Sequence, residues 1–219
     1  MSVDREQYLT TMGFPIWVLR ESQEPSDTGD KDELKVWSEL AATVHECTLC
    51  ALHKSRTQAV FGAGRRNADL LIVGEAPGAE EDRKGEPFVG RAGQLLNAML
   101  AAIELARDDV YIANILKCRP PQNRDPSTEE AATCTPYLEQ QLFLIRPKII
   151  LALGRIAAQW LLQSNEPVGR LRGHVRHFGS QKTPLVVSYH PAYLLRSPLK
   201  KAKAWEDLIL VRQLLRMEE

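Results

Sequence analysis

Apolar residues recur at two different spacings along the chain, and the two spacings alternate from residue 34 onward. Short, continuously apolar runs, which are typical of strands buried on both faces, occupy residues 69–73, 110–114, 148–153 and 185–189. Apolar residues at helical spacing predict helices over residues 34–53, 92–105, 127–145, 155–162 and 199–216. Strands that alternate with helices favour a parallel sheet with helices on both faces. We therefore predict an α/β fold, a three-layer α/β/α arrangement with a central, mainly parallel four-stranded sheet.

The first 33 residues have a different pattern and are predicted to lie outside the domain formed by residues 34–219. Residues 21–33 are polar and acidic and contain a proline and a glycine, which predicts a flexible linker. Residues 12–19 form an apolar cluster that is too small to bury itself. This peptide either docks on the domain that follows or binds a protein partner.

The overall composition indicates only a folded protein, whereas the distribution of charge along the chain indicates a function. The 219 residues are 44% hydrophobic and 26% charged, which excludes a disordered or collagen-like protein, and the formal net charge is zero. Residues 146–204, however, hold eleven basic residues and one acid, Glu166. A field of this kind suits a phosphate backbone, and a solvated basic face is the alternative. The candidate phosphate contacts are Arg170, Arg172, Arg176, Arg196, Lys200, Lys201 and Lys203.

The cellular setting follows from what the chain does not carry. No apolar run approaches the roughly 20 residues that span a bilayer, and the first residues lack the pattern of a signal peptide. We expect a cytoplasmic protein with no membrane contact, associated with the nucleoid when bound to DNA. In such a reducing compartment the four cysteines are expected to be free thiolates or metal ligands and not disulfides.

Unusual residues follow three of the four predicted strands. Glu75, Asn114 and His190 lie where these strands end, and ligands of open parallel sheets bind at that edge. An amide can read hydrogen-bonding edges, an imidazole can stabilise a forming anion, and a carboxylate can orient water or face a cationic centre. Alternatively, His190, held extended by the proline that follows it, only caps the sheet. The remaining strand ends in Gly154, which we predict to start a plain connection.

Residues 74–93 contain five glycines and two prolines, which predicts a long tight loop whose backbone can approach a ligand. The loop has neither the Gly-Lys-Ser/Thr of a phosphate loop nor the pattern of a dinucleotide fingerprint. Within it, Phe88 lies in no predicted strand or helix that would bury it. It either stacks on a planar ligand or folds back into the core.

The four cysteines are Cys47, Cys50, Cys118 and Cys134. Four thiolates that include one Cys-x-x-Cys pair suit either a tetrahedral zinc ion or a 4Fe-4S cluster, and the spacing does not choose between them. Four unrelated buried thiols are the remaining interpretation. A metal group bound by all four would be structural, because no position is left open for a substrate.

Four segments, together with the cysteine spacing, resemble the iron-sulfur uracil-DNA glycosylases of family four. They are GEAPGAEED at 74–82, GEPFVGRAG at 85–93, NILKCRPPQNR at 114–124 and HPAYLL at 190–195, and the match extends over residues 45–208. The resemblance implies a monofunctional DNA-repair glycosylase that turns uracil out of DNA and hydrolyses its N-glycosidic bond, leaving an abasic site. It also implies a structural 4Fe-4S cluster on the four cysteines. The expected partner is uracil-containing single- or double-stranded DNA, bound by a monomer.

The same resemblance implies residue roles. Phe88 would stack on the extruded uracil, Asn114 would read its polar edge, and His190 would donate toward uracil O2. Residues Glu75, Ala76 and Pro77 would line the pocket, and Leu194 would fill the gap left in the duplex. Ala76 stands where the best-known uracil glycosylases place an aspartate, so the candidates for activating water are, in order, Glu75, Glu81 and Asn123.

A related branch of the family traps the sugar with a histidine in a loop after the 114–124 motif. Residues 124–126 are Arg-Asp-Pro here, so turnover is expected instead of covalent trapping. Two other functions compete with this one. A non-enzymatic four-cysteine module, with zinc or an iron-sulfur cluster, would only bind nucleic acid, and a cluster-bearing nuclease would need a two-metal carboxylate set that the sequence lacks.

Overall fold

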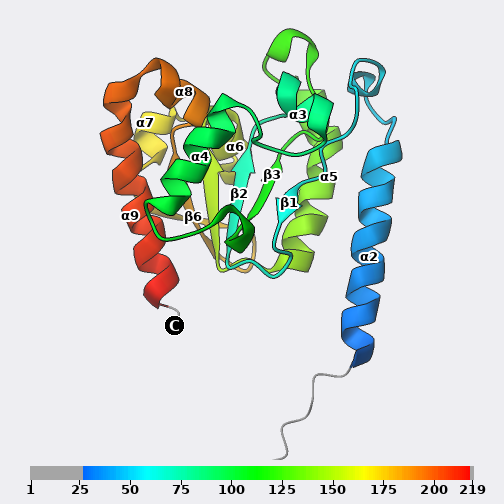
Figure 1. Ribbon diagram of the computed structural model, residues 1–219, viewed down its shortest axis with the longest axis horizontal. Coiled ribbons are helices and arrows are strands. Elements are labelled where there is room, and N and C mark those ends of the chain that lie inside the picture. The colour runs from blue at the N-terminus through cyan, green and yellow to red at the C-terminus, as the bar shows by residue number, and fades with distance from the viewer. Residues whose placement is uncertain (1–26, 218–219) are drawn as a thin grey trace, which may run out of the picture. The chain divides into compact units, whose positions relative to one another are not determined.

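The structure is a computed structural model that describes residues 27–217 (Figure 1). The chain divides into two units, Met1–Lys35 and Val36–Glu219, and the account below concerns the second. The predicted apolar peptide 12–19 lies outside the described residues. The predicted linker is wrong from residue 27 onward, because helix α2 spans Asp27–Glu46. Acidic residues, in which this part of the sequence is rich, are favoured near a helix N-terminus.

A mixed sheet of six strands forms the centre of the second unit, in the order β1-β3-β2-β4-β6-β5. The four predicted runs are confirmed as the parallel strands β2 (Leu70–Gly74), β3 (Tyr111–Asn114), β4 (Ile149–Leu153) and β6 (Thr183–Ser188). The predicted strand count is wrong, because β1 (Ala63–Gly64) and β5 (Val175–Phe178) add antiparallel edges. β1 has only two residues and β5 is half polar, so neither produces an apolar run.

Helices cover both faces of this sheet, which confirms the three-layer α/β/α prediction (Figure 1). Because side chains of a strand alternate between faces, Leu70 and Ile72 pack on one side and Leu71 and Val73 on the other. The first side is covered by α4 (Arg91–Ala101), α8 (Pro191–Arg196) and α9 (Lys201–Met217). The second is covered by residues 37–44 of α2, α5 (Thr128–Ile145), α6 (Arg155–Leu162) and α7 (Val168–Leu171).

Shorter elements lie in the connections. The predicted loop at 74–93 contains a helix of its own, α3 (Ala79–Lys84), so its interpretation as continuous loop is wrong. The 3-10 helices are η1 (Ala51–Lys54), η2 (Arg107–Asp109), η3 (Pro121–Asn123) and η4 (Pro198–Lys200). Among residues 27–217, none of the helices has the length and apolar character that a membrane crossing requires.

The order of the strands determines where a ligand can bind. From β2 the chain goes to β3 on one side, and then crosses to β4 on the other side of β2. This reversal is a topological switch point, and the connections leaving the carboxyl ends of the strands separate there to form a crevice. The segments after β2, β3 and β6, which carry the predicted site residues, all leave from that edge.

Candidate active site

A cavity of about 410 Å³ lies at the carboxyl ends of the strands. It collects residues from three separate connections, and these include every residue predicted to bind uracil. Its lining is Glu75, Ala76, Pro77, Gly78, Glu81, Phe88, Ala92, Asn114, Pro120, Asn123, Arg124, His190, Ala192, Tyr193 and Arg196. In the structure, as predicted, Phe88, Asn114 and His190 therefore line one cavity.

Asn114 ends β3 and is the polar group most deeply set in this cavity. Its side chain is 2% exposed, and its Oδ1 atom is buried without a hydrogen-bond partner among the described residues. An unpaired buried acceptor costs about 1–3 kcal/mol. The cavity therefore presents an acceptor that a bound group with an N–H could satisfy.

Gly74, at the end of β2, lets the Asn114 amide and the Phe88 ring approach the strand. A Cβ atom at position 74 would lie 2.4 Å from Asn114 Oδ1 and 2.8 Å from Phe88 Cε2. Neither contact is possible for real atoms, so any side chain at this position would push the two site residues away. Glycine here is therefore a requirement of the pocket.

Phe88 folds back into the core, as one of its two interpretations predicted, and its ring also faces the cavity. It is 5% exposed and belongs to the core cluster on the α4 side, yet it also lines the cavity. Its ring centroid lies 5.4 Å from that of His190, with the planes tilted by 30°. A planar ligand that entered beside these rings would find an aromatic face and an imidazole already fixed in place.

The turn that carries Phe88 is held by Glu81. Phe88 has a φ of +53°, a left-handed conformation that is uncommon for an aromatic residue. Oε1 of Glu81 accepts hydrogen bonds from the backbone N–H groups of Val89 at 2.9 Å and Gly90 at 3.0 Å. Glu81 thus orients the loop, and the work of its carboxylate in the structure is largely positional.

His190 follows β6 and is the N-cap of α8. The backbone N–H of Ala192 donates to its Nδ1 at 3.1 Å, so His190 caps a helix and not, as the alternative had it, the sheet. Burial, helped by the charge of Arg196, lowers the pKa of His190 to about 4. The ring is therefore neutral at pH 7. Because Nδ1 accepts, the proton lies on Nε2, which makes this atom a hydrogen-bond donor.

Glu75 is the carboxylate that follows β2 directly. Burial raises its pKa above the ordinary value, with a further rise from nearby Asp125 and an opposing effect of Arg155. Arg155 also forms an ion pair with Asp125. Charged groups from two more connections therefore act on this carboxylate, and sequence analysis had assigned neither of them to the site.

Gly154 is another site residue that sequence reasoning missed. It directly follows β4 with a φ of +90°, and a Cβ atom there would lie 2.9 Å from the Cβ atom of His190. The predicted plain connection is confirmed, because α6 begins at Arg155, but the close packing of this glycine against His190 was not predicted. Its position at the end of a central parallel strand was the available signal.

The rim of the cavity near Asn123 is fixed by ion pairs. Asn123 and its neighbour Gln122 both have positive φ angles, and Asn123 Oδ1 accepts from Arg119 Nε at 2.8 Å. Arg124 donates to both carboxylate oxygens of Glu130, at 2.8 and 2.6 Å. Glu130 in turn forms a capping box with Ser127 at the start of α5. Asn123 lies at the rim of the cavity, and Asn114 lies in its interior.

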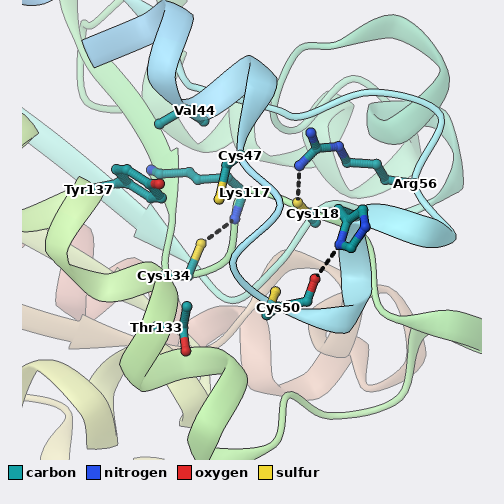
Figure 2. Close-up of a pocket in the computed structure, with 10 residues that line it drawn as sticks. Val44, Cys47, Cys50, Arg56, Lys117, Cys118, Thr133, Cys134 and Tyr137 are labelled. Carbon is teal, nitrogen blue, oxygen red and sulfur yellow. Dashed lines mark hydrogen bonds between the residues drawn. The ribbon is translucent and has the colours of Figure 1, made fainter.

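A second cavity gathers the four cysteines (Figure 2). Cys47 and Cys50 come from the segment between α2 and η1, Cys118 from the segment after β3, and Cys134 from α5. Arg56 Nη1 donates to the sulfur of Cys118 at 2.9 Å, and the backbone N–H of Lys117 donates to that of Cys134 at 3.2 Å. Among residues 27–217, no three Cys, His, Asp or Glu side chains converge as ligands of a single metal ion.

Comparison with known proteins can now be set beside this geometry. Residues 61–209 match the family model of the uracil DNA glycosylase superfamily. A Type-4 uracil-DNA glycosylase of Archaeoglobus fulgidus is 44% identical over 183 residues, covering 80% of this chain and 92% of the relative. The Type-4 enzyme of Thermotoga maritima is 42% identical, covering 72% and 82%. The chain belongs to the type-4 uracil-DNA glycosylases.

The type-5 branch of these glycosylases is also similar, but less so. The Type-5 uracil-DNA glycosylase of Pyrobaculum aerophilum is 32% identical over 146 residues, covering 60% of this chain and 64% of the relative. Membership of the type-4 family confirms the resemblance that the motifs indicated and the superfamily fold.

Two predicted DNA contacts of this type-4 chain do not fit the structure. Leu194 is 1% exposed and packs in the core between α4 and α9, so it cannot enter a duplex. Arg172 has a side chain that is 9% exposed and pairs with the buried carboxylate of Asp207 at 2.8 Å. Its Nη2 also bonds the carboxylate of Glu206 at 2.8 Å, which leaves no charge for a phosphate. Leu194 lies on a buried helix face, and Arg172 is engaged in ion pairs. Neither feature can be recognised from the charges and spacing along the sequence.

The other predicted basic contacts remain accessible. Arg170, Arg196, Lys201 and Lys203 are exposed, Lys200 and Arg176 are partly buried, and Arg196 reaches the lining of the cavity itself. The basic groups of α8, η4 and the start of α9 therefore lie along a continuous stretch of chain that begins at the pocket.

Proposed function

We propose that this chain removes uracil from DNA by holding a base turned out of the helix in the 410 Å³ cavity and hydrolysing its N-glycosidic bond. The product is an abasic site, and the chain acts as a monofunctional DNA-repair glycosylase. Membership of the type-4 uracil-DNA glycosylases supports this activity. Turning a base out of the stack costs a few kcal/mol, which is less at a mismatch or in a single strand.

The observation that carries the proposal is the unpaired acceptor of Asn114. Uracil has an N–H at N3 beside its O4 oxygen, so one amide can accept from N3 and donate to O4. Buried Oδ1 lacks a partner among the described residues and is satisfied by such a donor. Cytosine has no hydrogen at N3 and therefore pairs poorly with the amide in this orientation. Phe88 supplies the aromatic face on which the base stacks.

His190 stabilises the leaving base. Its neutral ring holds the proton on Nε2, and this N–H donates to uracil O2 as negative charge builds on the base. Because burial lowers the pKa of His190 to about 4, donation does not depend on protonation of the ring near neutral pH. The hydrogen bond from Ala192 to Nδ1 fixes both the tautomer and the ring orientation.

Glu75 acts on the sugar side. Cleavage passes through a sugar that resembles an oxocarbenium ion, and a nearby carboxylate stabilises it and orients the attacking water. Glu75 lines the cavity, whereas Glu81 already binds two backbone N–H groups and Asn123 lies at the rim. We therefore keep Glu75 first among the three candidates. With no histidine in the 124–126 segment, the enzyme turns over.

Cys47, Cys50, Cys118 and Cys134 are proposed to hold a structural 4Fe-4S cluster. Their donor set fits such a group, because four thiols surround one cavity and N–H groups of Arg56 and Lys117 donate to two of the sulfurs. The bound cluster would cross-link three distant segments of the chain, and it takes no part in the reaction. Loss of the cluster is therefore expected to loosen the segment after β3.

DNA contacts are proposed for Arg170, Arg196, Lys200 and Lys201. These side chains belong to the segment that carries the excess of positive charge, those of Arg196 and Lys201 are exposed, and Arg196 lines the cavity itself. Neutralising phosphates releases counterions, so affinity for DNA is expected to fall steeply as salt rises. The substrate is single- or double-stranded uracil-containing DNA, met inside the cell by a monomer.

The decisive experiment incubates the purified chain with an end-labelled oligonucleotide that contains one uracil and then treats it with alkali. Strand cleavage at the uracil, and none in matched cytosine and thymine oligonucleotides, is the expected result. Tight binding without cleavage would overturn the proposal in favour of a non-enzymatic four-cysteine module. Cleavage before alkali would instead indicate a nuclease.

A further inference from the structure

Lys117 joins the two cavities of the molecule. Its backbone N–H donates to Cys134 Sγ at 3.2 Å, and its carbonyl accepts from the N–H of Val60 at 2.7 Å. Its Nζ donates to the backbone carbonyl of Asn114 at 3.0 Å and to Gln141 Oε1 at 2.6 Å. One residue thus contacts both a cysteine ligand and the residue that reads the base.

The ammonium of Lys117 lies in an uncommon place. The residue is 1% exposed and lines the cysteine cavity, where Figure 2 shows its backbone N–H directed at the sulfur of Cys134. The two oxygens that its Nζ contacts are uncharged amide oxygens. Burying an ammonium without an anion is costly. An anionic group bound by the thiolates of the neighbouring cavity would supply the missing charge.

The contacts of Lys117 hold the peptide after Asn114 from one side. From the other side, the N–H of Ile115 donates to the carbonyl of Gly74 at 3.0 Å. Gln141, the second partner of the ammonium, is itself fixed, because its Nε2 donates to Phe61 O at 3.0 Å and to Tyr111 OH at 3.2 Å. The Asn114 side chain therefore extends into the pocket from a peptide that is held at both ends.

We propose that Lys117 is a positioning residue for base recognition: its ammonium holds the Asn114 peptide in place, and the anionic cysteine-bound group is the counter-charge of that ammonium. This inference rests on the proposed function. It assigns to the cysteine site an effect on uracil recognition in addition to its cross-linking of the chain.

The test uses Lys117→Met in the full chain, purified with its cluster. Methionine has nearly the same length and keeps the backbone bonds to Cys134 and Val60, but it removes the bonds to Asn114 and Gln141. Binding is measured to DNA that carries 2′-fluoro-2′-deoxyuridine, which resists cleavage, and to the abasic product. We expect about a tenfold loss for the uracil-bearing DNA, the size of one lost charged hydrogen bond, and no change for abasic DNA.

Arg56→Met is the matched control. Arg56 is a second cation beside the cysteine cavity, and its guanidinium donates to Cys118 Sγ and to the carbonyl of His45, which lie outside the uracil pocket. Either substitution removes one positive charge near the cluster, so both are expected to make its reduction potential more negative. Only Lys117→Met is expected to weaken uracil binding.

Several results would overturn the inference. They are unchanged uracil binding in Lys117→Met, an equal loss for uracil-bearing and abasic DNA, an equal loss in Arg56→Met, or an unchanged potential. If Lys117→Met does not fold, Lys117→Gln receives the same measurements, with visible absorbance and melting temperature as controls. Failure of the unsubstituted chain to release uracil would instead overturn the proposed function, so the two failures are distinguishable.

Discussion

The uracil pocket and the cysteine cavity share the segment 114–118, but they differ in whether their buried polar groups have hydrogen-bond partners. In the pocket, Asn114 leaves its Oδ1 buried and unpaired. Beside the cysteines, the backbone and the side chain of Lys117 are both engaged in hydrogen bonds. A buried acceptor without a hydrogen-bond partner lowers the stability of the free protein, and a bound ligand offsets this cost. A network in which the polar groups are hydrogen-bonded stabilises the protein itself. The first region is thus arranged for binding and the second for stability.

The largest effects are expected in the pocket. Asn114→Ala and His190→Ala each remove one polar group that faces the base, and losing such a donor typically costs about 100-fold to 1000-fold in rate. Both variants should still fold, and only His190→Ala should lower the melting temperature, because it removes the N-cap hydrogen bond of α8. Single-turnover excision and thermal unfolding are the measurements. Full activity in Asn114→Ala would remove the recognition role.

Gly74→Ala should act on the pocket without touching a polar group. The added Cβ displaces both Asn114 and Phe88, and a misplacement of about 1 Å can cost 100-fold in rate. Gly169→Ala is a useful control outside the pocket, since its new Cβ meets only Tyr189 OH, at an ordinary contact distance of 3.7 Å. The difference in excision rate between the two variants tests whether glycine at position 74 is needed for the pocket; equal rates would contradict it.

Cys118→Ala, in the cysteine cavity, should lower stability first and activity only as a consequence. We expect the visible absorbance of the cluster and the melting temperature to fall together, because metal binding energy is folding energy. Excision then declines as a consequence of lost structure. Visible spectra and melting curves on the same preparation check this. A variant that keeps its colour and its stability would exclude Cys118 as a ligand.

The pH dependence distinguishes His190 from an ordinary histidine. Burial lowers its pKa from 6.5 to about 4, so the neutral ring is favoured in the folded state. Its contribution to stability is present above about pH 6.5 and is lost as the pH falls toward about 4. Binding of free uracil should therefore stay constant from pH 8 to about 5. A titration step near pH 6.5 that disappears in His190→Gln would show that the ring is not held neutral.

The smallest effects on DNA binding are expected from the basic residues. They distinguish Lys201 from Arg172, two cations of the same basic segment that the sequence does not tell apart. Lys201→Ala should weaken DNA binding and reduce the slope of affinity against salt by about one. Arg172→Ala should leave that slope unchanged and lower stability, because it breaks the buried pair with Asp207. Binding titrations at several salt concentrations decide this. A reduced slope in Arg172→Ala would restore it as a phosphate contact.

Much of this fold could be predicted from the sequence because its central strands are buried on both faces and read as unbroken apolar runs. The edge strand Val175–Phe178 was not predicted, because it is half exposed and polar. The site residues at strand ends were also predictable, since parallel strands bring their carboxyl ends to one edge. The membership of Phe88 in both core and pocket could not be decided from local sequence.

Contacts between distant segments account for the rest. The requirement for glycine at positions 74 and 154 depends on side chains that arrive from other strands. The role of Leu194 was assigned from the family resemblance, but the face of α8 on which it lies is buried. No pattern along the chain shows which basic residue meets Asp207 and which meets solvent.

The central claim is that Asn114 accepts a hydrogen bond from N3 of uracil, and free-base inhibition tests it most directly. Uracil and 1-methyluracil keep the N3 hydrogen, whereas 3-methyluracil lacks it. The account predicts that the first two inhibit excision and that 3-methyluracil does not, with this discrimination lost in Asn114→Ala. Equal inhibition by all three bases would contradict it.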